Sequence, residues 1–287
     1  MSIAVSVVLG TYNRLAFLKI AIESIRREVA DHAHEIIVVD GGSTDGTMEW
    51  LAGQKDIVTI VQHNRGTWQG KAIERRSWGY FMNLAFKCAQ GKYVCMLSDD
   101  CLVVPGAIIN GLSLFEQRLS KNEKIGAVAF YWRNWPENDV YFIGLTLGGN
   151  MFVNHGLFLR QALEDVGFID EHTYQFYHAD GDLCLKMWQM GYACIASPDS
   201  FIEHYSHANI VVRKSNTVAA ENDWESFLNK WEGIFYFTDY PDIGGCLEQK
   251  YLDAANTGKI FNSAESLGYK FAGLRKKIRA KIVSGFQ

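Results

Sequence analysis

Apolar and polar positions in the first part of the chain follow two alternating periods. Residues 3–9 form a short, almost continuous apolar run rich in β-branched side chains, which predicts a strand buried on both faces. Over residues 15–29 the apolar side chains recur every three or four positions, which predicts a helix with one buried face. The two patterns return as further expected strands (35–39, 58–62, 93–97) and helices (from Thr47, over 78–89, after Pro105). Such alternation predicts an α/β fold with a mostly parallel sheet flanked by helices.

The remainder of the chain has a different pattern. Two strand-like stretches, 127–132 and 141–145, lie among aromatic residues and glycines, and two short helices are expected around Leu163 and Leu183. Beyond Asn216 the pattern is mostly helical, without a strong strand signal.

These changes of pattern divide the chain into two predicted units. We expect an α/β domain over residues 1–215 and a helical C-terminal extension over residues 216–287. Within the domain, residues 1–104 have the organisation of a nucleotide-binding half. We assign residues 105–215 to a second half, which would bind a second substrate, the acceptor.

Composition supports a folded protein and narrows its partners. Of the 287 residues 48% are hydrophobic and only four are proline, so a large core can form and a disordered chain is excluded. The net charge of −4 argues against general nucleic-acid binding, because proteins that bind nucleic acids usually carry a basic surface. No apolar run reaches the roughly 18 residues of a membrane span, and the first residues lack the basic start of a signal peptide, so we expect a cytoplasmic protein. The six cysteines contain no Cys-x-x-Cys pair and indicate neither a zinc site nor a disulfide framework.

Polar side chains follow three of the four expected parallel strands. Thr11–Arg14 follow the first strand, Asp40–Asp45 the second, and Asp99 and Asp100 the fourth. Because ligands of open parallel sheets bind beyond the carboxyl ends of the strands, we expect these side chains to share one pocket.

The second of these strand ends carries an isolated carboxylate. A carboxylate that leaves an apolar strand is costly without a partner, so Asp40 is expected to accept a hydrogen bond from a ribose hydroxyl or a base N–H. Ser43 and Asp45 are instead expected to form a turn and to cap the next helix.

The adjacent carboxylates Asp99 and Asp100 indicate a ligand site more strongly than Asp40 does. They repel each other, and a divalent cation that accepts oxygen ligands would relieve this repulsion. An Asp-Asp pair is also compatible with an ordinary solvated turn. Its position at a strand end favours a site where Mg²⁺ or Mn²⁺ bridges a carboxylate to substrate phosphates.

Together these motifs resemble those of the family 2 inverting glycosyltransferases, which have the GT-A fold, a Rossmann-like sheet flanked by helices. The resemblance covers roughly residues 3–207 and excludes the extension. The segments that resemble the family motifs are Thr11–Arg14, Val38–Thr47, Asn64–Gly66, Asn83, Gly91–Asp100, Val166–Glu171, Asp180–Lys186 and Gly191–Tyr192.

The resemblance implies a donor site. Thr11, Asn13 and Asp40, with Arg14 in the same strand-end motif, would bind the nucleoside of a nucleotide-sugar donor of the UDP, GDP or dTDP type. Asp99 would lie near the ribose or the donor sugar.

The resemblance also implies the position of a metal ion and of a base. Asp100 and His204 would hold Mn²⁺ or Mg²⁺ on the diphosphate, and Asp180 would be the general base that deprotonates the acceptor hydroxyl. The start of a helix favours the ionised carboxylate that a base requires. Asp182 is expected to form an ion pair with Lys186, four positions later on the same helix.

Two further groups of residues are weaker candidates. Met82 replaces the arginine that often precedes Asn83 in the family, so base recognition would fall to Arg75 or Arg76. In the second half of the domain, side chains with aromatic faces could contact acceptor sugars, although packing roles are equally compatible with the sequence. These acceptor candidates are Trp132, Tyr177 and His178.

The last segment, residues 267–287, carries six basic residues and no acid, and its apolar positions Leu267, Phe271, Leu274, Ile278 and Ile282 form a stripe. A basic amphipathic helix is typical of peripheral contact with a membrane surface, where lipid-linked acceptors reside. A helix packed on the domain with a solvated basic face fits the same pattern, and the sequence leaves both readings open.

The sequence therefore favours a metal-dependent inverting glycosyltransferase. It would move a sugar from a nucleotide-sugar to a saccharide or lipid-linked acceptor, in surface polysaccharide or glycan biosynthesis. Two alternatives remain. A sugar-nucleotide nucleotidyltransferase shares the sheet and the metal chemistry, but residues 10–14 poorly match its glycine-rich phosphate loop. A catalytically inactive nucleotide- or glycan-binding protein is compatible with Ser98 and Ala179, which replace acidic residues of the family motifs.

Overall fold

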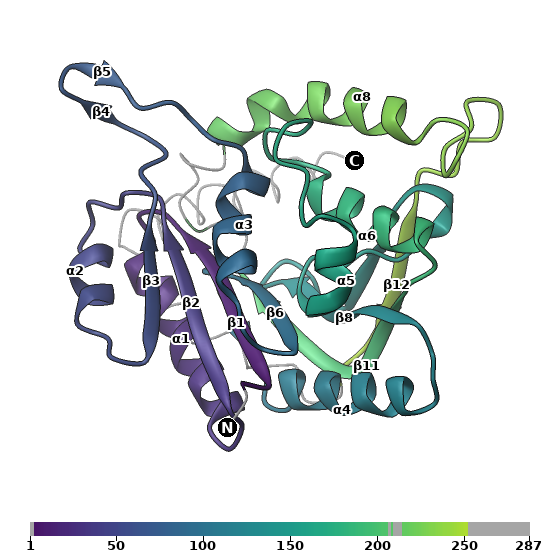
Figure 1. The fold of residues 1–287 in the computed structure, drawn as a ribbon, viewed down its shortest axis with the longest axis horizontal. Helices are drawn as coiled ribbons and strands as arrows, with labels where there is room; N and C mark the ends of the chain where they lie inside the picture. Colours follow the sequence, from purple (N-terminus) through teal and green to yellow (C-terminus); the bar gives the residue numbers. More distant parts are fainter. Residues whose placement is uncertain (1–2, 206–207, 209–213, 252–287) are drawn as a thin grey trace, which may run out of the picture.

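The computed structural model describes residues 3–205, 208 and 214–251. It shows a curled central sheet with helices on both faces (Figure 1). In chain order the elements are β1 (Val5–Thr11), α1 (Leu15–Val29), β2 (His34–Asp40), α2 (Thr47–Ala52), β3 (Ile57–Val61), β4 (Thr67–Trp68), β5 (Lys71–Ala72), α3 (Trp78–Cys88), β6 (Tyr93–Ser98), β7 (Cys101–Val103), α4 (Ala107–Ser120), β8 (Ile125–Asn134), β9 (Tyr141–Leu145), η1 (Leu147–Gly149), β10 (Gly156–Leu159), α5 (Arg160–Asp165), α6 (Ala179–Gln189), β11 (Ala193–His204), η2 (Thr217–Ala219), α8 (Ala220–Trp231) and β12 (Gly245–Gln249).

The first half of the sheet is parallel, as the alternating pattern predicts. Its strands lie in the order β3-β2-β1-β6, and every pairing among them is parallel. The apolar run that predicted a strand buried on both faces is β1, in which Val7, Val8 and Leu9 are fully buried. The carboxyl ends of β1, β2 and β6 therefore meet at one edge of the sheet, where Thr11 lies opposite Asp40.

The second half of the sheet is largely antiparallel, which the sequence did not predict. The short strand β10 runs antiparallel between β6 and β8, and β9 pairs antiparallel with β8. The long strand β11 runs parallel to β8 and also pairs antiparallel with β7. The last residue of β11, His204, lies opposite Cys101 in this pairing. This return of the chain brings His204 next to the carboxylates at the end of β6.

Each face of the sheet has its own core. Leu18 of α1 and Phe115 of α4 belong to the core on one face. Phe86 of α3, Leu183 of α6 and Phe227 of α8 belong to the core on the other face. The C-terminal extension therefore shares a hydrophobic core with the α/β domain.

The described part of the extension contains both helix and strand. The expected helix is present as α8, and β12, which was not expected, pairs antiparallel with β9 at the edge of the sheet. Residues 267–287, the predicted basic amphipathic segment, lie outside the described residues. Within the described residues, no helix combines the length and apolar character needed to cross a bilayer.

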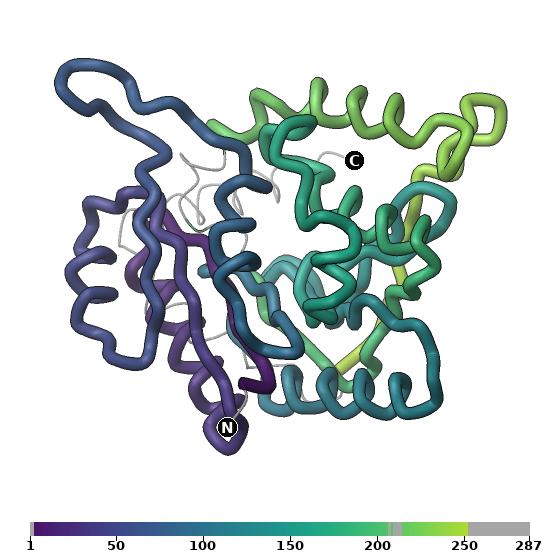
Figure 2. Tube along the Cα trace, in the orientation of Figure 1, coloured from purple at the N-terminus to yellow at the C-terminus, as the bar shows by residue number. Residues whose placement is uncertain are grey.

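Between β3 and α3 the chain leaves the sheet as a projecting arm, residues 62–77 (Figure 2). The β4–β5 hairpin forms its tip, and the turn at Gln69 and Gly70 has φ values of 50° and 77°, the positive values of a tight hairpin turn. Trp68 in this hairpin is 72% exposed. The arm leads into α3, and its two ends are joined by a hydrogen bond from the backbone N–H of Arg76 to Oδ1 of Asn64.

A buried ion pair fixes the end of β11. Arg133 Nε and Nη2 of β8 donate to the two carboxylate oxygens of Glu203 at 2.7 and 2.9 Å, and the hydroxyl of Tyr141 donates to Glu203 Oε1 at 2.6 Å. Glu203 is fully buried and Arg133 is almost so. Because Glu203 directly precedes His204, this pair holds the strand that presents the histidine.

We expect Glu203→Ala to lower the free energy of unfolding by about 3–5 kcal/mol, because it leaves the buried guanidinium of Arg133 without its carboxylate. Denaturant unfolding measures this loss. The matched control is Glu164→Ala, which removes an exposed pair with Arg160 and is expected to cost less than about 0.5 kcal/mol. Similar losses in the two variants would contradict the structural importance of the buried pair.

Candidate active site

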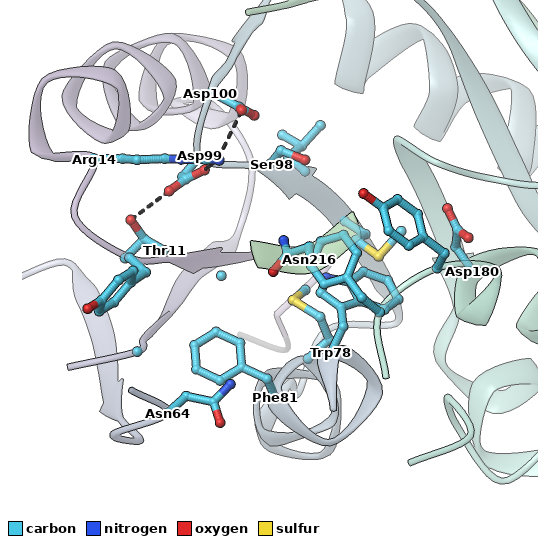
Figure 3. Close-up of a pocket in the computed structure, with 18 of the residues that line it drawn as sticks. Thr11, Arg14, Asn64, Trp78, Phe81, Ser98, Asp99, Asp100, Asp180 and Asn216 are labelled. Atoms are coloured by element: carbon cyan, nitrogen blue, oxygen red, sulfur yellow. Dashed lines mark hydrogen bonds and ion pairs between the residues drawn. The ribbon is translucent and has the colours of Figure 1, made fainter. Parts of the chain in front are cut away.

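A cavity of about 470 Å³ opens at the carboxyl ends of β1 and β6 (Figure 3). Residues from both halves of the α/β domain line the cavity, and Asn216 of the extension also lines it. The predicted site residues that line the cavity are Thr11, Arg14, Arg75, Arg76, Asp99, Asp100, Trp132, Tyr177, His178, Asp180 and His204.

Arg14 bridges the two adjacent carboxylates. Its Nη1 donates to Oδ1 of Asp99 at 2.7 Å and to Oδ2 of Asp100 at 2.9 Å. The hydroxyl of Thr11 donates to Asp99 Oδ2 at 2.7 Å (Figure 3). Burial disfavours the charge of Arg14, but the two carboxylates outweigh this effect and raise the pKa of Arg14 above its ordinary value. The repulsion that we expected a divalent cation to relieve is therefore already offset by a guanidinium.

His204 lies beside Asp100, as the sequence predicted. Its Nε2 is 3.4 Å from Asp100 Oδ1, and its Nδ1 is 2.9 Å from Oδ1 of Asn134. When Nδ1 donates to Asn134, the ring directs Nε2 toward the carboxylate. Carboxylate oxygens suit Mg²⁺ and Mn²⁺, and imidazole is a common ligand of transition metals.

These two side chains fit a metal ion whose remaining ligands come from elsewhere. In the described ranges, no group of three or more His, Cys, Asp or Glu side chains is arranged to hold a metal. A divalent ion at Asp100 and His204 could complete its coordination with substrate phosphates and water, as Mg²⁺ commonly does.

Asp40 and Asn13 lie outside the cavity lining. The carboxylate of Asp40 is fully buried and accepts from the backbone N–H groups of Gly42 and Ser43 and from the hydroxyl of Ser43. Asn13 Oδ1 accepts from the backbone N–H of Thr44 at 2.7 Å. Both side chains shape the loop after β2, and their contacts with a nucleoside stay predictions.

Asp45 of the neighbouring loop has the structural role expected of it, whereas Ser43 contacts Asp40 and Asn13 and caps no described helix. Asp45 Oδ1 accepts from the backbone N–H and the hydroxyl of Thr47 at the start of α2. Asp45 Oδ2 accepts from the backbone N–H of Leu15 at the start of α1. One carboxylate thus stabilises the beginnings of two helices that flank the strand ends.

Asp180 lies across the cavity from Asp99 and Asp100 (Figure 3). It is the second residue of α6, and its side chain is half-buried. Oδ2 accepts from Nδ2 of Asn154 at 2.9 Å, and Oδ1 accepts from the backbone N–H of Gly181 at 2.9 Å. Two neutral donors therefore orient this carboxylate.

The extension fixes the loop that leads into Asp180. Asp223 of α8 is fully buried, and its two oxygens accept from the backbone N–H groups of Gln175, Phe176 and Tyr177, each at 2.8 Å. The ring of His178 also stacks on Phe227 of α8, with centroids 5.1 Å apart. The position of the candidate base thus depends on a helix outside the α/β domain.

The expected ion pair between Asp182 and Lys186 is wrong. Asp182 is fully buried and accepts from Lys230 Nζ and Trp231 Nε1 of α8 and from the hydroxyl of Tyr174. Lys186 donates to two backbone carbonyls instead. Spacing along one helix could not predict this, because the partners of Asp182 come from a second helix packed against it.

The acceptor candidates Trp132, Tyr177 and His178 all line the cavity. Tyr177 and His178 belong to the loop before α6, and Trp132 of β8 lies edge-on to His204 with centroids 5.5 Å apart. Trp132 therefore also supports the candidate metal ligand. Two further aromatic side chains, Trp78 and Phe176, line the cavity and contact each other.

The two arginines proposed for base recognition have different surroundings. Arg76 is exposed and pairs with Glu74 at 3.1 Å. Arg75 is half-buried and donates to Ser215 and Asn216. Recognition of a base by either residue stays a prediction.

Four residues of the site were given no role from the sequence: Asn154, Arg65, Asn216 and Asp223. Arg65 lies within the motif Asn64–Gly66, which suggested no chemistry for it. Asn216 and Asp223 lie beyond the family resemblance, so no motif pointed to them. For Asp223 a signal existed, because Phe227 and Trp231 follow it at intervals of four and mark the same buried face of the helix.

Comparison with known proteins finds a family match over the first part of the chain. Residues 6–122 match the family model described as glycosyl transferase family 2. The chain is 23% identical over 238 residues to the uncharacterized protein y4gI of Sinorhizobium fredii, covering 71% of this chain and 25% of that protein. It is 29% identical over 136 residues to the uncharacterized glycosyltransferase MG060 of Mycoplasma genitalium, covering 46% of this chain and 42% of that protein. The resemblance to glycosyltransferase family 2 is confirmed, and the chain spans less than half the length of either relative.

Solved structures confirm the GT-A fold. The mannosyltransferase PcManGT from Pyrobaculum calidifontis, in complex with GDP-Man and Mn²⁺, superimposes with a TM-score of 0.56 at 19% identity, covering 80% of this chain and 65% of that one. TarS from S. aureus gives 0.54 at 14% identity, covering 81% and 44%. A TarS fragment, residues 1–349, in complex with UDP-GlcNAc gives 0.51 at 15% identity, covering 71% and 59%.

We expect Asp223→Ala to lower the free energy of unfolding by about 2 kcal/mol or more, because three backbone N–H groups lose their acceptor. Glu225→Ala is the matched control, since Glu225 is exposed on the same helix, and it is expected to change stability by less than about 0.5 kcal/mol. Urea unfolding of the three proteins gives both values. A loss in Asp223→Ala no larger than the loss in the control would show that α8 does not hold the loop.

Proposed function

We propose that the protein is a metal-dependent inverting glycosyltransferase that moves a sugar from a nucleotide-sugar donor to a saccharide or lipid-linked acceptor. One observation supports this most directly. A carboxylate oriented by neutral donors, Asp180, faces a carboxylate–imidazole pair, Asp100 and His204, across one cavity. Inversion requires a base and a leaving group on opposite sides of the transferred sugar.

The donor would occupy the side of the cavity formed by β1 and β6. Thr11 and Asp99 would contact the nucleoside or the donor sugar, and Arg76 the base. Two proteins of the same fold bind GDP-Man and UDP-GlcNAc, which supports a GDP- or UDP-linked donor here. A dTDP-linked donor has no such support.

Asp100 and His204 would hold Mn²⁺ or Mg²⁺ against the donor diphosphate. When bound, the ion supplies positive charge that stabilises the departing nucleoside diphosphate. Arg14 offsets part of the negative charge of the paired carboxylates and holds them in place, so Asp100 is oriented before any ion binds.

Asp180 would act as the general base. Its carboxylate takes the proton of the acceptor hydroxyl while that oxygen forms a bond to the anomeric carbon and the bond from this carbon to the diphosphate breaks. Asn154 holds the carboxylate, and Asp223 holds the loop that precedes it. Trp132, Tyr177 and His178 would contact the acceptor. A role in surface polysaccharide or glycan biosynthesis on the cytoplasmic side of a membrane, with contact through residues 267–287, is part of this proposal.

We expect Asp180→Asn to retain the affinity for nucleotide-sugar and to reduce transfer by about 10² to 10⁴, because the amide keeps the shape but cannot accept the proton. Donor titration and a transfer assay separate the two effects. Asp199→Asn, an exposed carboxylate outside the cavity, is the control and should transfer as wild type. Asp182→Asn is unsuitable as a control because Asp182 is buried and bonded to α8. Full transfer by Asp180→Asn would exclude this residue as the base.

We expect Asp100→Ala to abolish the enhancement of nucleoside diphosphate binding by Mn²⁺, because it removes one of two protein ligands. Arg14 keeps its bond to Asp99 in this variant, so the fold should persist. Calorimetric titration of UDP and GDP with Mn²⁺ or with EDTA measures the enhancement. An unchanged effect of Mn²⁺ would remove Asp100 from the metal site.

A further inference from the structure

Arg65 and Arg75 hold two guanidinium groups together on the cavity wall, one near each end of the projecting arm. Arg65 donates to Oγ of Ser215 at 2.8 Å and to Oδ1 of Asn216 at 3.0 Å. Arg75 donates to the carbonyl oxygen of Ser215 at 3.1 Å and also to Oδ1 of Asn216. Four N–H donors thus converge on three oxygen atoms of two adjacent residues.

The positive charge of this arginine pair is not compensated. In the part of the chain that the structure describes, the acceptors of both guanidinium groups are neutral oxygens and neither forms an ion pair. Burial, together with the neighbouring charge of Arg65, lowers the pKa of Arg75. Six of the other described arginines are placed differently. A carboxylate pairs with each of Arg14, Arg26, Arg76, Arg118, Arg133 and Arg160.

Two half-buried guanidinium groups side by side repel each other, and their most favourable partner is an anion with several oxygens. Arginine presents a planar fork of donors that matches phosphate and carboxylate. The oxygens of Ser215 and Asn216 occupy the positions that the oxygens of such an anion would take. Hydrogen bonds to an ionised acceptor are about twice as strong as those to neutral ones, so an anion would compete well for these donors.

We propose that Arg65 and Arg75 bind an anionic group of a substrate, a phosphate or a carboxylate, and that Ser215 and Asn216 occupy the site until this group displaces them. The inference deepens the proposed function, because it names a negative charge on one of the two substrates. The group belongs either to the donor diphosphate or to an acidic acceptor. The Arg65 guanidinium lies 5.4 Å from the ring centroid of Tyr12, next to Thr11, so the site adjoins the end of β1.

The test is calorimetric titration of the full chain with pyrophosphate in EDTA, which removes any contribution of a metal. Wild type is expected to bind pyrophosphate, and Arg65→Gln and Arg75→Gln are each expected to bind it about tenfold or more weakly. Lys71→Gln removes one charge from the exposed hairpin of the same arm and is the control for general electrostatics. It is expected to bind as wild type.

Variants of Asn216 separate a displaceable contact from a purely structural clamp. Asn216→Ala removes the competing oxygen and is expected to bind pyrophosphate more tightly than wild type. Asn216→Asp places a carboxylate between the two guanidinium groups and is expected to abolish binding while raising the melting temperature. A clamp with no role in binding predicts no gain in the first variant and no loss in the second, and either result would overturn the proposal.

Further titrations identify the source of the anion. If the arginine variants weaken binding of UDP or GDP but leave uridine or guanosine unaffected, the donor diphosphate occupies the site. If they weaken binding of a sugar phosphate or a uronic acid and leave UDP and GDP unaffected, the acceptor does. Absence of any effect on all of these ligands would overturn the proposal. None of the titrations involves transfer, so an absence of glycosyltransferase activity would leave their outcome unchanged.

Discussion

Two adjacent carboxylates at the end of a buried strand must be neutralised, and the cavity is organised around this requirement. Arg14 reaches from the loop after β1 and pairs with both Asp99 and Asp100, so it links the ends of β1 and β6. The second half of the sheet returns through β11 to place His204 against the other oxygen of Asp100. The buried pair of Arg133 and Glu203 stabilises that return. Parts of the chain far apart in sequence are thus held by charges that cannot be buried singly.

The parallel half of the fold was predictable because each of its elements has a local signal. An apolar run gives a strand, a three- or four-residue period gives a helix, and α1 occupies the expected residues 15–29. The antiparallel half was not predictable in the same way. β10 has only four residues, and β11 owes its length to pairing with β8 and β7 rather than to a pattern of its own. β12 is almost entirely exposed, so no burial pattern marks it in the sequence.

The residues of the candidate site also fall into a predictable and an unpredictable group. Side chains at the ends of parallel strands, such as Thr11, Asp99 and Asp100, were found because topology brings these ends together. Contacts between helices have no comparable signal in the sequence. Asp182 was assigned to the wrong lysine, and Asp223, which holds the loop before Asp180, was not assigned at all. Both errors concern α8. Its Lys230 and Trp231 are the partners of Asp182 on α6, and its buried Asp223 has its partners in the loop before α6.

The distribution of charge in the cavity follows from these contacts. Negative charge is concentrated at Asp100 and at Asp180, on opposite walls, while the uncompensated positive charge lies at Arg65 and Arg75. A ligand that carries charge of only one sign would compensate only part of the charge in the cavity. A substrate that brings an anion to the arginines and a cation to Asp100 satisfies both, and a nucleoside diphosphate bound to a divalent metal has this composition. In the proposed mechanism Asp180 would lie away from the diphosphate, on the side where a neutral hydroxyl would have to lose its proton.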